Sequence, residues 1–127
     1  WQQFKGKCDI IVGGTPCQSF SIAGKRRGFE DTRGTVFFSY VNAIKQVEPT
    51  YFIFENVKGI MSHDKGNTIK TILSAFDEIG YDLDFDIFNS KYYGVPQNRE
   101  RIYIVGKRRT DGEPKRAEGQ ANIFEYI

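Results

Sequence analysis

The chain has 127 residues, of which 39% are hydrophobic and 15% aromatic, so its size and composition suit one globular domain and exclude a disordered segment. It contains no apolar run long enough to span a membrane and no secretory signal sequence. Its two cysteines do not make a disulfide framework, and the net charge of +2 is too small to indicate nucleic-acid binding by itself. We therefore expect a cytoplasmic protein and, because no Met begins the chain, a piece of a longer protein or a processed one.

The first predicted strand, residues 8–12, is a short apolar run that reads as buried and leads into a turn with a thiol. Two glycines end this strand, and Pro16 restricts the backbone immediately before Cys17. A lone cysteine is usually a small buried hydrophobe, and on that ground we place Cys8 in the core. Cys17 follows a stiff turn, so we predict that it is presented to a ligand instead of packed.

Residues 20–34 form a predicted loop that is rich in glycine and in charge. Its glycines supply hinges, and four of its cations cluster near Cys17 in the sequence. These cations are Lys25, Arg26, Arg27 and Arg33. The loop suits two interpretations equally: a solvated surface segment, or a lid whose cations meet phosphates when it closes.

The next elements predict a strand–helix–strand unit. Apolar residues at helical spacing indicate a helix over residues 35–47, which Pro49 stops. The apolar run at 51–54 is typical of a parallel strand covered on both faces, and such units are right-handed crossovers. Ligands of open parallel sheets lie beyond the carboxyl ends of the strands. We therefore expect Cys17 and Glu55, which follow the two strands, to face one crevice.

A second helix is predicted over residues 67–79, with Gly80 as its C-terminal cap. Residues 81–88 alternate between apolar and acidic side chains, which predicts a half-exposed strand, antiparallel and at or near an edge. We expect its acidic face to be solvated and to hold no metal. That face comprises Asp82, Asp84 and Asp86. The single histidine, His63, is predicted to be a polar loop residue.

Two arginines precede the last apolar strand, residues 102–105. Arg99 and Arg101 are two positions apart, so an extended backbone projects both to the same side. They are either a pair of surface ions or a planar set of donors suited to a carbonyl or a phosphate. Beyond them, residues 110–127 have the composition of a polar linker or tail.

Three short motifs resemble, in their order, the catalytic-pocket motifs of the DNA (cytosine-5) methyltransferases. They are Pro16-Cys17-Gln18 with Ser19-Phe20-Ser21, then Glu55-Asn56-Val57, then Gln97-x-Arg99-x-Arg101. Each is weak alone, but the three in order are specific, and their spacings are typical of bacterial, restriction–modification members. The resemblance covers residues 8–106. It implies an α/β fold, part of a Rossmann-like S-adenosylmethionine-dependent methyltransferase fold, with a mostly parallel sheet and an antiparallel edge strand.

The resemblance also implies roles for individual residues. Cys17 would be the nucleophile that adds to carbon 6 of cytosine. Protonated Glu55 would hydrogen-bond ring nitrogen 3, Arg101 would hold the carbonyl oxygen, and Arg99 would support the pocket and the cysteine. Because a stacked base is inaccessible, the cytosine would have to flip out of the duplex.

The implied partners are double-stranded DNA and a cognate restriction endonuclease system. The resemblance implies no metal cofactor. The implied DNA contacts are Gln18, Ser21, Lys25 and Arg33. The methyl donor would be S-adenosylmethionine, and only two of the family's cofactor contacts have counterparts here, Pro16 and Val36.

The family's glycine-rich cofactor turn, its ribose-binding acid and its variable recognition segment have no counterpart in this sequence. We therefore expect residues 1–109 to be the target-base half of a catalytic domain, and residues 110–127 to lead towards an absent recognition region. Two alternatives stay open. One is a transfer RNA cytosine-5 methyltransferase, against which Ser19-Phe20-Ser21 argues. The other is a catalytically inactive fragment that binds DNA or a partner chain, which the missing cofactor turn favours.

Overall fold

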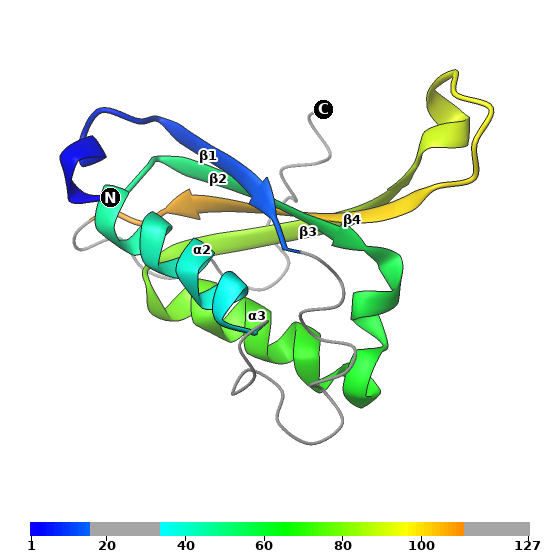
Figure 1. Ribbon diagram of the computed structural model, residues 1–127, viewed down its shortest axis with the longest axis horizontal. Helices are drawn as coiled ribbons and strands as arrows, with labels where there is room; N and C mark the ends of the chain where they lie inside the picture. Colours follow the sequence, from blue (N-terminus) through cyan, green and yellow to red (C-terminus); the bar gives the residue numbers. More distant parts are fainter. Residues whose placement is uncertain (16–33, 111–127) are drawn as a thin grey trace.

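A computed structural model describes residues 1–15 and 34–110 of the chain. Four strands form one sheet, and both α-helices lie against the same face of it (Figure 1). The strands are β1 (Ile10–Gly14), β2 (Tyr51–Val57), β3 (Tyr81–Asn89) and β4 (Glu100–Arg108). The helices are α2 (Gly34–Val47) and α3 (Asn67–Glu78). Short 3-10 turns occupy Gln2–Phe4, Lys58–Met61, His63–Gly66 and Ser90–Tyr93.

The sheet has the strand order β1-β2-β4-β3. β1 pairs parallel with β2, whereas β4 pairs antiparallel with both β2 and β3. Three strands therefore point the same way, and β4 runs against them from an interior position. The α/β class is confirmed, and so is an edge strand with antiparallel pairing, because β3 lies at the edge and pairs only with β4 within the described residues.

The predicted strand–helix–strand unit is confirmed as β1, α2 and β2. Helix α2 begins one residue before the predicted start and ends at Val47, as predicted. Helix α3 ends at Glu78, and Gly80 has a φ of +97°, which confirms the predicted cap because glycine adopts the left-handed region without strain. Periodic apolar spacing was sufficient to locate both helices.

The core between the sheet and the helices is mainly aromatic. Phe76 of α3 lies within 4.4–6.2 Å, centroid to centroid, of the rings of Phe37, Tyr40, Phe52 and Phe54. Most of these ring pairs are edge-to-face, the arrangement that ring quadrupoles favour. Phe37, Phe52 and Phe76 are completely buried. This cluster joins both helices to the centre of the sheet.

The expectation that the strand at 51–54 is covered on both faces is wrong. Side chains of β2 alternate between buried and partly exposed positions, with Phe52 and Phe54 buried and Ile53 and Glu55 partly exposed. The reason is that both described helices pack on one face, so the other face of β2 lacks a helical layer within the described residues.

The expectation of a buried first strand with Cys8 in the core is also wrong. β1 begins at Ile10, two residues after Cys8, and Cys8 is only partly buried, with its Sγ 3.2 Å from the carbonyl oxygen of Ile10. Ile10 and Val12 are 47% and 66% exposed. The physical reason is alternation: Ile11 packs against the core, so Ile10 and Val12 lie on the sheet face that carries no described helix.

The acidic face predicted on residues 81–88 is solvated only in part. Asp86 is exposed, but Asp84 is buried and the Asp82 side chain is 17% exposed. Arg109 explains the burial of Asp82, because its Nη1 lies 3.0 Å from Asp82 and 3.2 Å from Asp77. An ion pair across the end of the sheet therefore replaces water at this position.

Two further observations concern the described residues only. His63 lies in the 3-10 turn His63–Gly66 with its Nδ1 2.6 Å from the hydroxyl of Thr68, which agrees with a polar loop residue. The described part of the chain contains no group of three His, Cys, Asp or Glu side chains that could hold a metal ion. Neither α-helix in that part is long and apolar enough to cross a bilayer. The domain boundary at residue 109 stays a prediction, because residues 111–127 lie outside the described part.

Candidate functional site

Of the ten predicted site residues, four lie in the described part of the chain: Val36, Glu55, Arg99 and Arg101. The other six lie outside it, so their placement stays a prediction. They are Pro16, Cys17, Gln18, Ser21, Lys25 and Arg33. The candidate site therefore comprises these four described residues and the residues that contact them.

Glu55 and Arg101 form an ion pair on the sheet face that carries no described helix. Arg101 is directly opposite Val57 in the ladder between β2 and β4, so its side chain is a diagonal neighbour of Glu55. Arg101 Nε lies 3.3 Å from Glu55 Oε1, and the two side chains are 22% and 35% exposed. Nε is buried and has no hydrogen bond of good geometry within the described residues, so the contact is an ion pair. The structure thus brings together two residues that the sequence analysis placed in one pocket.

The end of β1 lies directly beside Glu55. Gly14 is the register partner of Glu55, and a Cβ atom built on Gly14 would lie 2.3 Å from the backbone oxygen of Glu55 and 3.1 Å from its Oε2. A Cβ atom on Gly13 would lie 2.8 Å from Cε2 of Tyr40. The two glycines therefore belong to the strand and permit close approach on both of its faces, whereas the sequence analysis had them ending the strand.

Asn56 holds the chain that leads out of β1. Its side chain is 2% exposed, and its Nδ2 donates to the carbonyl oxygen of Thr15 at 3.2 Å. Its Oδ1 accepts a hydrogen bond from the backbone N–H of Val57 at 2.8 Å. Thr15 is the residue immediately before the Pro16-Cys17 turn. Sequence analysis gave Asn56 no separate role, although an asparagine at an inward position of an apolar strand was the available signal.

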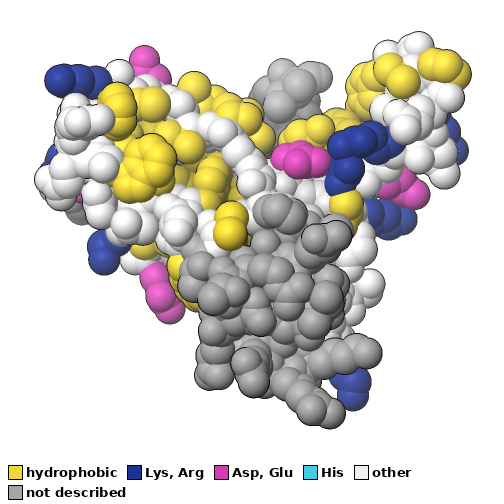
Figure 2. Space-filling model, viewed as in Figure 1, with side chains coloured by type: hydrophobic (Ala, Val, Ile, Leu, Met, Phe, Trp, Pro, Cys, Tyr) yellow, Lys and Arg dark blue, Asp and Glu magenta, His cyan; other side chains and the backbone are white. Residues whose placement is uncertain are grey.

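Arg99 lies immediately before β4 and its side chain is exposed. The described contacts join Arg101 with Glu55 and include none from the guanidinium of Arg99. The backbone N–H of Arg99 instead donates to Asn89 Oδ1 at 3.2 Å. Figure 2 shows acidic and basic side chains next to one another near the base of the projecting β3–β4 hairpin. The predicted pairing of the two guanidiniums on one carbonyl or phosphate stays a prediction.

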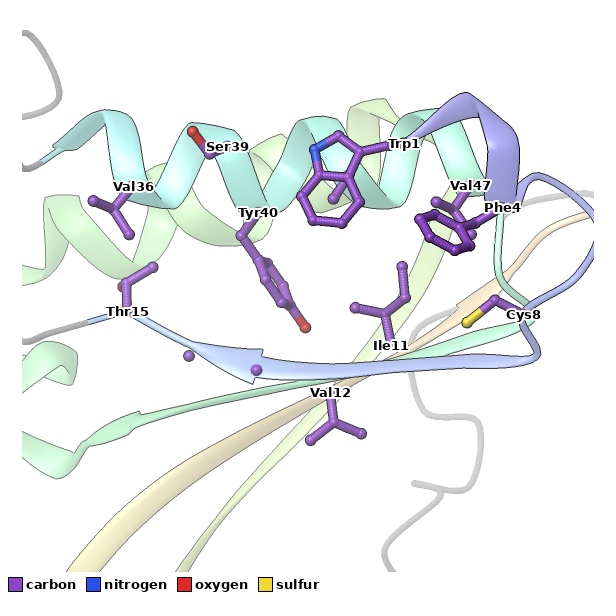
Figure 3. Close-up of a pocket in the computed structure, with 13 residues that line it drawn as sticks. Trp1, Phe4, Cys8, Ile11, Val12, Thr15, Val36, Ser39, Tyr40 and Val47 are labelled. Atoms are coloured by element: carbon purple, nitrogen blue, oxygen red, sulfur yellow. The ribbon is translucent and has the colours of Figure 1, made fainter.

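A cavity of about 490 Å³ lies between β1 and α2 (Figure 3). Thr15 and Val36 line one end of it, Phe4 and Cys8 line the other, and Trp1 lies between the two ends. Its walls are mostly apolar side chains, and Val36, a predicted cofactor contact, is 44% exposed there.

Tyr40 closes the middle of this cavity. Its hydroxyl donates to the carbonyl oxygen of Ile53 at 2.8 Å, and burial raises the pKa of Tyr40 well above its usual range. Thr15 and Ser39 add two further side-chain hydroxyls to the lining, and no acidic side chain lines the cavity within the described residues. The cavity can therefore contact the apolar side of a bound cofactor, but it offers no carboxylate to ribose hydroxyls. This agrees with the missing ribose-binding acid noted in the sequence.

Most of this chain is similar to known methyltransferases. The sequence model of the family described as C-5 cytosine-specific DNA methylase matches residues 2–125. The orphan methyltransferase M.Rho11sI of Bacillus phage rho11s is 60% identical over 100 residues, which are 79% of this chain and 20% of that protein. The type II methyltransferase M.HpaII of Haemophilus parainfluenzae is 56% identical over 108 residues, which are 84% of this chain and 30% of that protein.

Among solved structures, a prophage-encoded E. coli protein described as a DNA modification methyltransferase superposes with a TM-score of 0.60 at 27% identity. The match covers 79% of this chain and 26% of that one. The chain thus spans only about 20–30% of the length of these relatives. A family model that matches nearly the whole chain, together with the close phage and bacterial relatives, confirms the resemblance seen in the three motifs. The chain belongs to the C-5 cytosine-specific DNA methylase family.

Proposed function

We propose that the protein carrying this chain transfers a methyl group from S-adenosylmethionine to carbon 5 of a cytosine in DNA. The observation that carries this proposal is the position of the Glu55–Arg101 pair, beside Gly14 at the carboxyl end of β1. From Gly14 the chain runs through Thr15, which Asn56 holds, into the Pro16-Cys17 turn. Membership of the family supports assigning this reaction to the carboxyl of Glu55, the guanidinium of Arg101 and the thiol of Cys17, two residues after Thr15 in the sequence.

The thiol would open the reaction. The thiolate of Cys17 adds to carbon 6 of cytosine, and the electron pair of the ring double bond makes carbon 5 nucleophilic. Carbon 5 takes the methyl group of S-adenosylmethionine, whose bond between sulfur and methyl breaks and leaves the thioether S-adenosylhomocysteine. Loss of the proton on carbon 5 then restores the double bond and releases the Cys17 thiolate, so the protein is regenerated and methylcytosine remains.

Glu55 and Arg101 would hold the edge of the base during these steps. Ring nitrogen 3 and the carbonyl oxygen of cytosine are neighbours on one edge, and Glu55 Oε1 and Arg101 Nε are neighbours at 3.3 Å on one face of the sheet. A protonated Glu55 donates to nitrogen 3 while Arg101 donates to the carbonyl oxygen, which stabilises the charge that develops on addition. Arg99, at the start of the same strand, would support this pocket.

The remaining contacts are part of the same proposal. Val36 would contact the methyl donor from the cavity beside β1, together with Pro16, which follows Thr15 in the chain. The target cytosine would be flipped out of the duplex, and residues of the segment after Cys17 would contact DNA. These residues are Gln18, Ser21, Lys25 and Arg33. In a bacterial cytoplasm, a cognate restriction endonuclease would be the partner. The name type II methyltransferase of one relative supports this partner, whereas the name orphan methyltransferase of another does not.

Covalent trapping tests the proposal. Fluorine at carbon 5 cannot leave as a cation, so the release step is blocked and the adduct persists. The full-length protein, with S-adenosylmethionine and duplex DNA that contains 5-fluorocytosine, should form a complex that survives boiling in detergent. Cys17→Ser should abolish this complex, because a serine hydroxyl supplies almost no anion at neutral pH. Cys8→Ser is the matched control and should leave the complex intact. Cys8 lies at the far end of the cavity from Thr15, and its thiol donates a hydrogen bond to the carbonyl oxygen of Ile10.

Three results would overturn parts of the proposal. A complex that persists in Cys17→Ser, or that maps to Cys8, would remove the nucleophile assigned here. Methyl transfer to transfer RNA but not to duplex DNA would favour the RNA enzyme. Tight DNA binding without transfer or trapping would favour the inactive, binding module.

A further inference from the structure

Asn89 connects both arms of the hairpin that carries the predicted arginines. It is the last residue of β3, and its side chain is nearly buried, with 9% exposure. Its Oδ1 accepts hydrogen bonds from the backbone N–H groups of Lys91 at 3.1 Å and of Arg99 at 3.2 Å. Its Nδ2 donates to Oδ1 of Asn98. One side chain therefore bonds to the outgoing and to the returning arm.

These bonds lie where the regular ladder of the sheet ends. Asn89 and Glu100 are the last register pair of β3 and β4, and the hairpin beyond them projects from the sheet (Figure 1). Ser90 continues the contact, since its backbone N–H donates to the carbonyl oxygen of Arg99 at 3.1 Å and its hydroxyl donates to that of Gln97 at 2.7 Å. The backbone at Arg99 thus depends on polar contacts from the end of β3.

The same backbone leads directly to the ion pair of the candidate site. Arg101 is two residues after Arg99, opposite Phe88 on one side and Val57 on the other. Its Nε reaches Glu55 at 3.3 Å, a contact that a change in the register or twist of the strand end would lengthen. Displacements of about 1 Å in a catalytic arrangement can reduce rates by about a hundredfold.

We propose that Asn89 is a positioning residue for the target-base site: it sets the backbone at Arg99 and so holds Arg101 in its place beside Glu55. The proposal rests on the proposed function. Asn89 touches neither of the groups assigned to the base and acts through the strand. An asparagine suits this place because one planar amide carries both the acceptor for the two backbone N–H groups and the donor for Asn98.

The test compares three variants of the full-length protein. Asn89→Ala removes all three bonds. Asn89→Asp keeps an oxygen for Lys91 and Arg99, and the amide of Asn98 can turn to donate to it. Asn42→Ala is the control, because Asn42 is exposed on α2 and accepts only from Gln46 in the described contacts.

Two measurements are made on each variant. Amide hydrogen exchange reports on the backbone N–H of Arg99, with the buried Ile104 of β4 as an internal reference. Single-turnover methyl transfer, at saturating S-adenosylmethionine and DNA, reports on the chemical step. Asn89→Ala should raise exchange at Arg99 about tenfold, leave Ile104 unchanged, and slow transfer about tenfold to a hundredfold with DNA affinity changed less than about threefold. In Asn89→Asp, exchange at Arg99 and the rate of methyl transfer should both lie within about threefold of the values for the unaltered protein. In Asn42→Ala, both should equal those values.

The outcomes separate this proposal from the function on which it rests. Equal exchange increases at Arg99 and Ile104 would show general loss of stability and overturn it. Unchanged exchange at Arg99 in Asn89→Ala would overturn it too. So would slow transfer in Asn89→Asp while Arg99 stays protected. If the unaltered protein itself neither transfers a methyl group nor forms the fluorocytosine complex, the proposed function fails, and the exchange arm alone then decides whether Asn89 holds Arg99.

Discussion

The two faces of β2 differ in the interactions that their side chains make: one packs against apolar rings and the other carries a pair of charged groups. On the face towards the helices, Phe52 and Phe54 are buried against the rings of α2 and α3. On the other face, Ile53 is partly exposed and Glu55 pairs with Arg101. Apolar packing is non-directional and depends on area, whereas an ion pair or hydrogen bond depends on distance and angle. The helical face therefore provides stability, and the open face provides a defined position for polar groups.

Asn56 shows how the two faces meet. It follows Glu55 and lies on the buried face by alternation, yet its amide donates a hydrogen bond to the carbonyl oxygen of Thr15, the residue after β1, instead of packing against the rings. The apolar layer thus encloses the polar side chain of Asn56, which holds the exit of β1 close to the carboxyl of Glu55. A single strand with side chains that alternate between faces can hence serve the core and the site at once.

The largest expected effect comes from the helical face. Phe76→Ala removes a completely buried ring that contacts four others, so the free energy of unfolding should fall by about 3–5 kcal/mol. Phe85→Ala is the matched control, since Phe85 is 40% exposed, and it should cost about 1 kcal/mol or less. Urea-induced unfolding measures both. Similar losses in the two variants would contradict the assignment of stability to the helical face.

The second effect belongs to the open face. Glu55→Gln in the full-length protein should slow methyl transfer by two to three orders of magnitude, or about 3 kcal/mol, because a hydrogen bond made in the transition state is altered. The free energy of unfolding should change by less than about 1 kcal/mol, since the pair with Arg101 is partly exposed. Glu100→Gln, which alters the neighbouring exposed pair with Lys58, should leave transfer unchanged. Lost DNA affinity with normal turnover of the bound complex would show that Glu55 does not act in the chemical step.

The smallest effect concerns a polar bond within the core. The hydroxyl of Tyr81, which is 1% exposed, donates to the carbonyl oxygen of Pro49 at 2.6 Å, so Tyr81→Phe should destabilise by about 1 kcal/mol at neutral pH.

The same bond predicts an alkaline transition. Burial raises the pKa of Tyr81 to about 12, against an unfolded value of about 10. The neutral phenol is thus favoured in the folded state, and its contribution is complete below about pH 10 and lost as the pH rises towards 12. Stability measured from pH 9 to pH 12 should fall less steeply in Tyr81→Phe than in the unaltered protein. Tyr92→Phe, at a residue that is 75% exposed, should not change this slope. Parallel slopes for all three proteins would remove Tyr81 from the alkaline transition.

Elements whose signal lies in a few adjacent residues were predictable from the sequence. Apolar spacing located α2 and α3 almost to the residue, and alternation located the edge strand β3. Burial was less predictable, because it depends on which elements pack together. Cys8 and Asp84 have side chains of the types expected inside and outside, respectively, yet Cys8 is partly exposed and Asp84 is buried. Cys8 precedes β1, which begins at Ile10, and so does not share the enclosure predicted for the strand.

The three motifs identified the family from the sequence by itself, because they preserve the residue types that the family's chemistry requires. The two helices and the parallel pair of strands also followed from local sequence pattern. Only the tertiary structure decided how the motif residues are held. Asn56 reaches Thr15 across 41 positions, Asn89 reaches Arg99 across 10, and Gly14 lies against Glu55 on a neighbouring strand. The physical reason is that hydrogen bonds and close backbone contacts are set by distances of a few ångströms in space, and separation along the chain does not reveal which residues the sheet register brings within that distance.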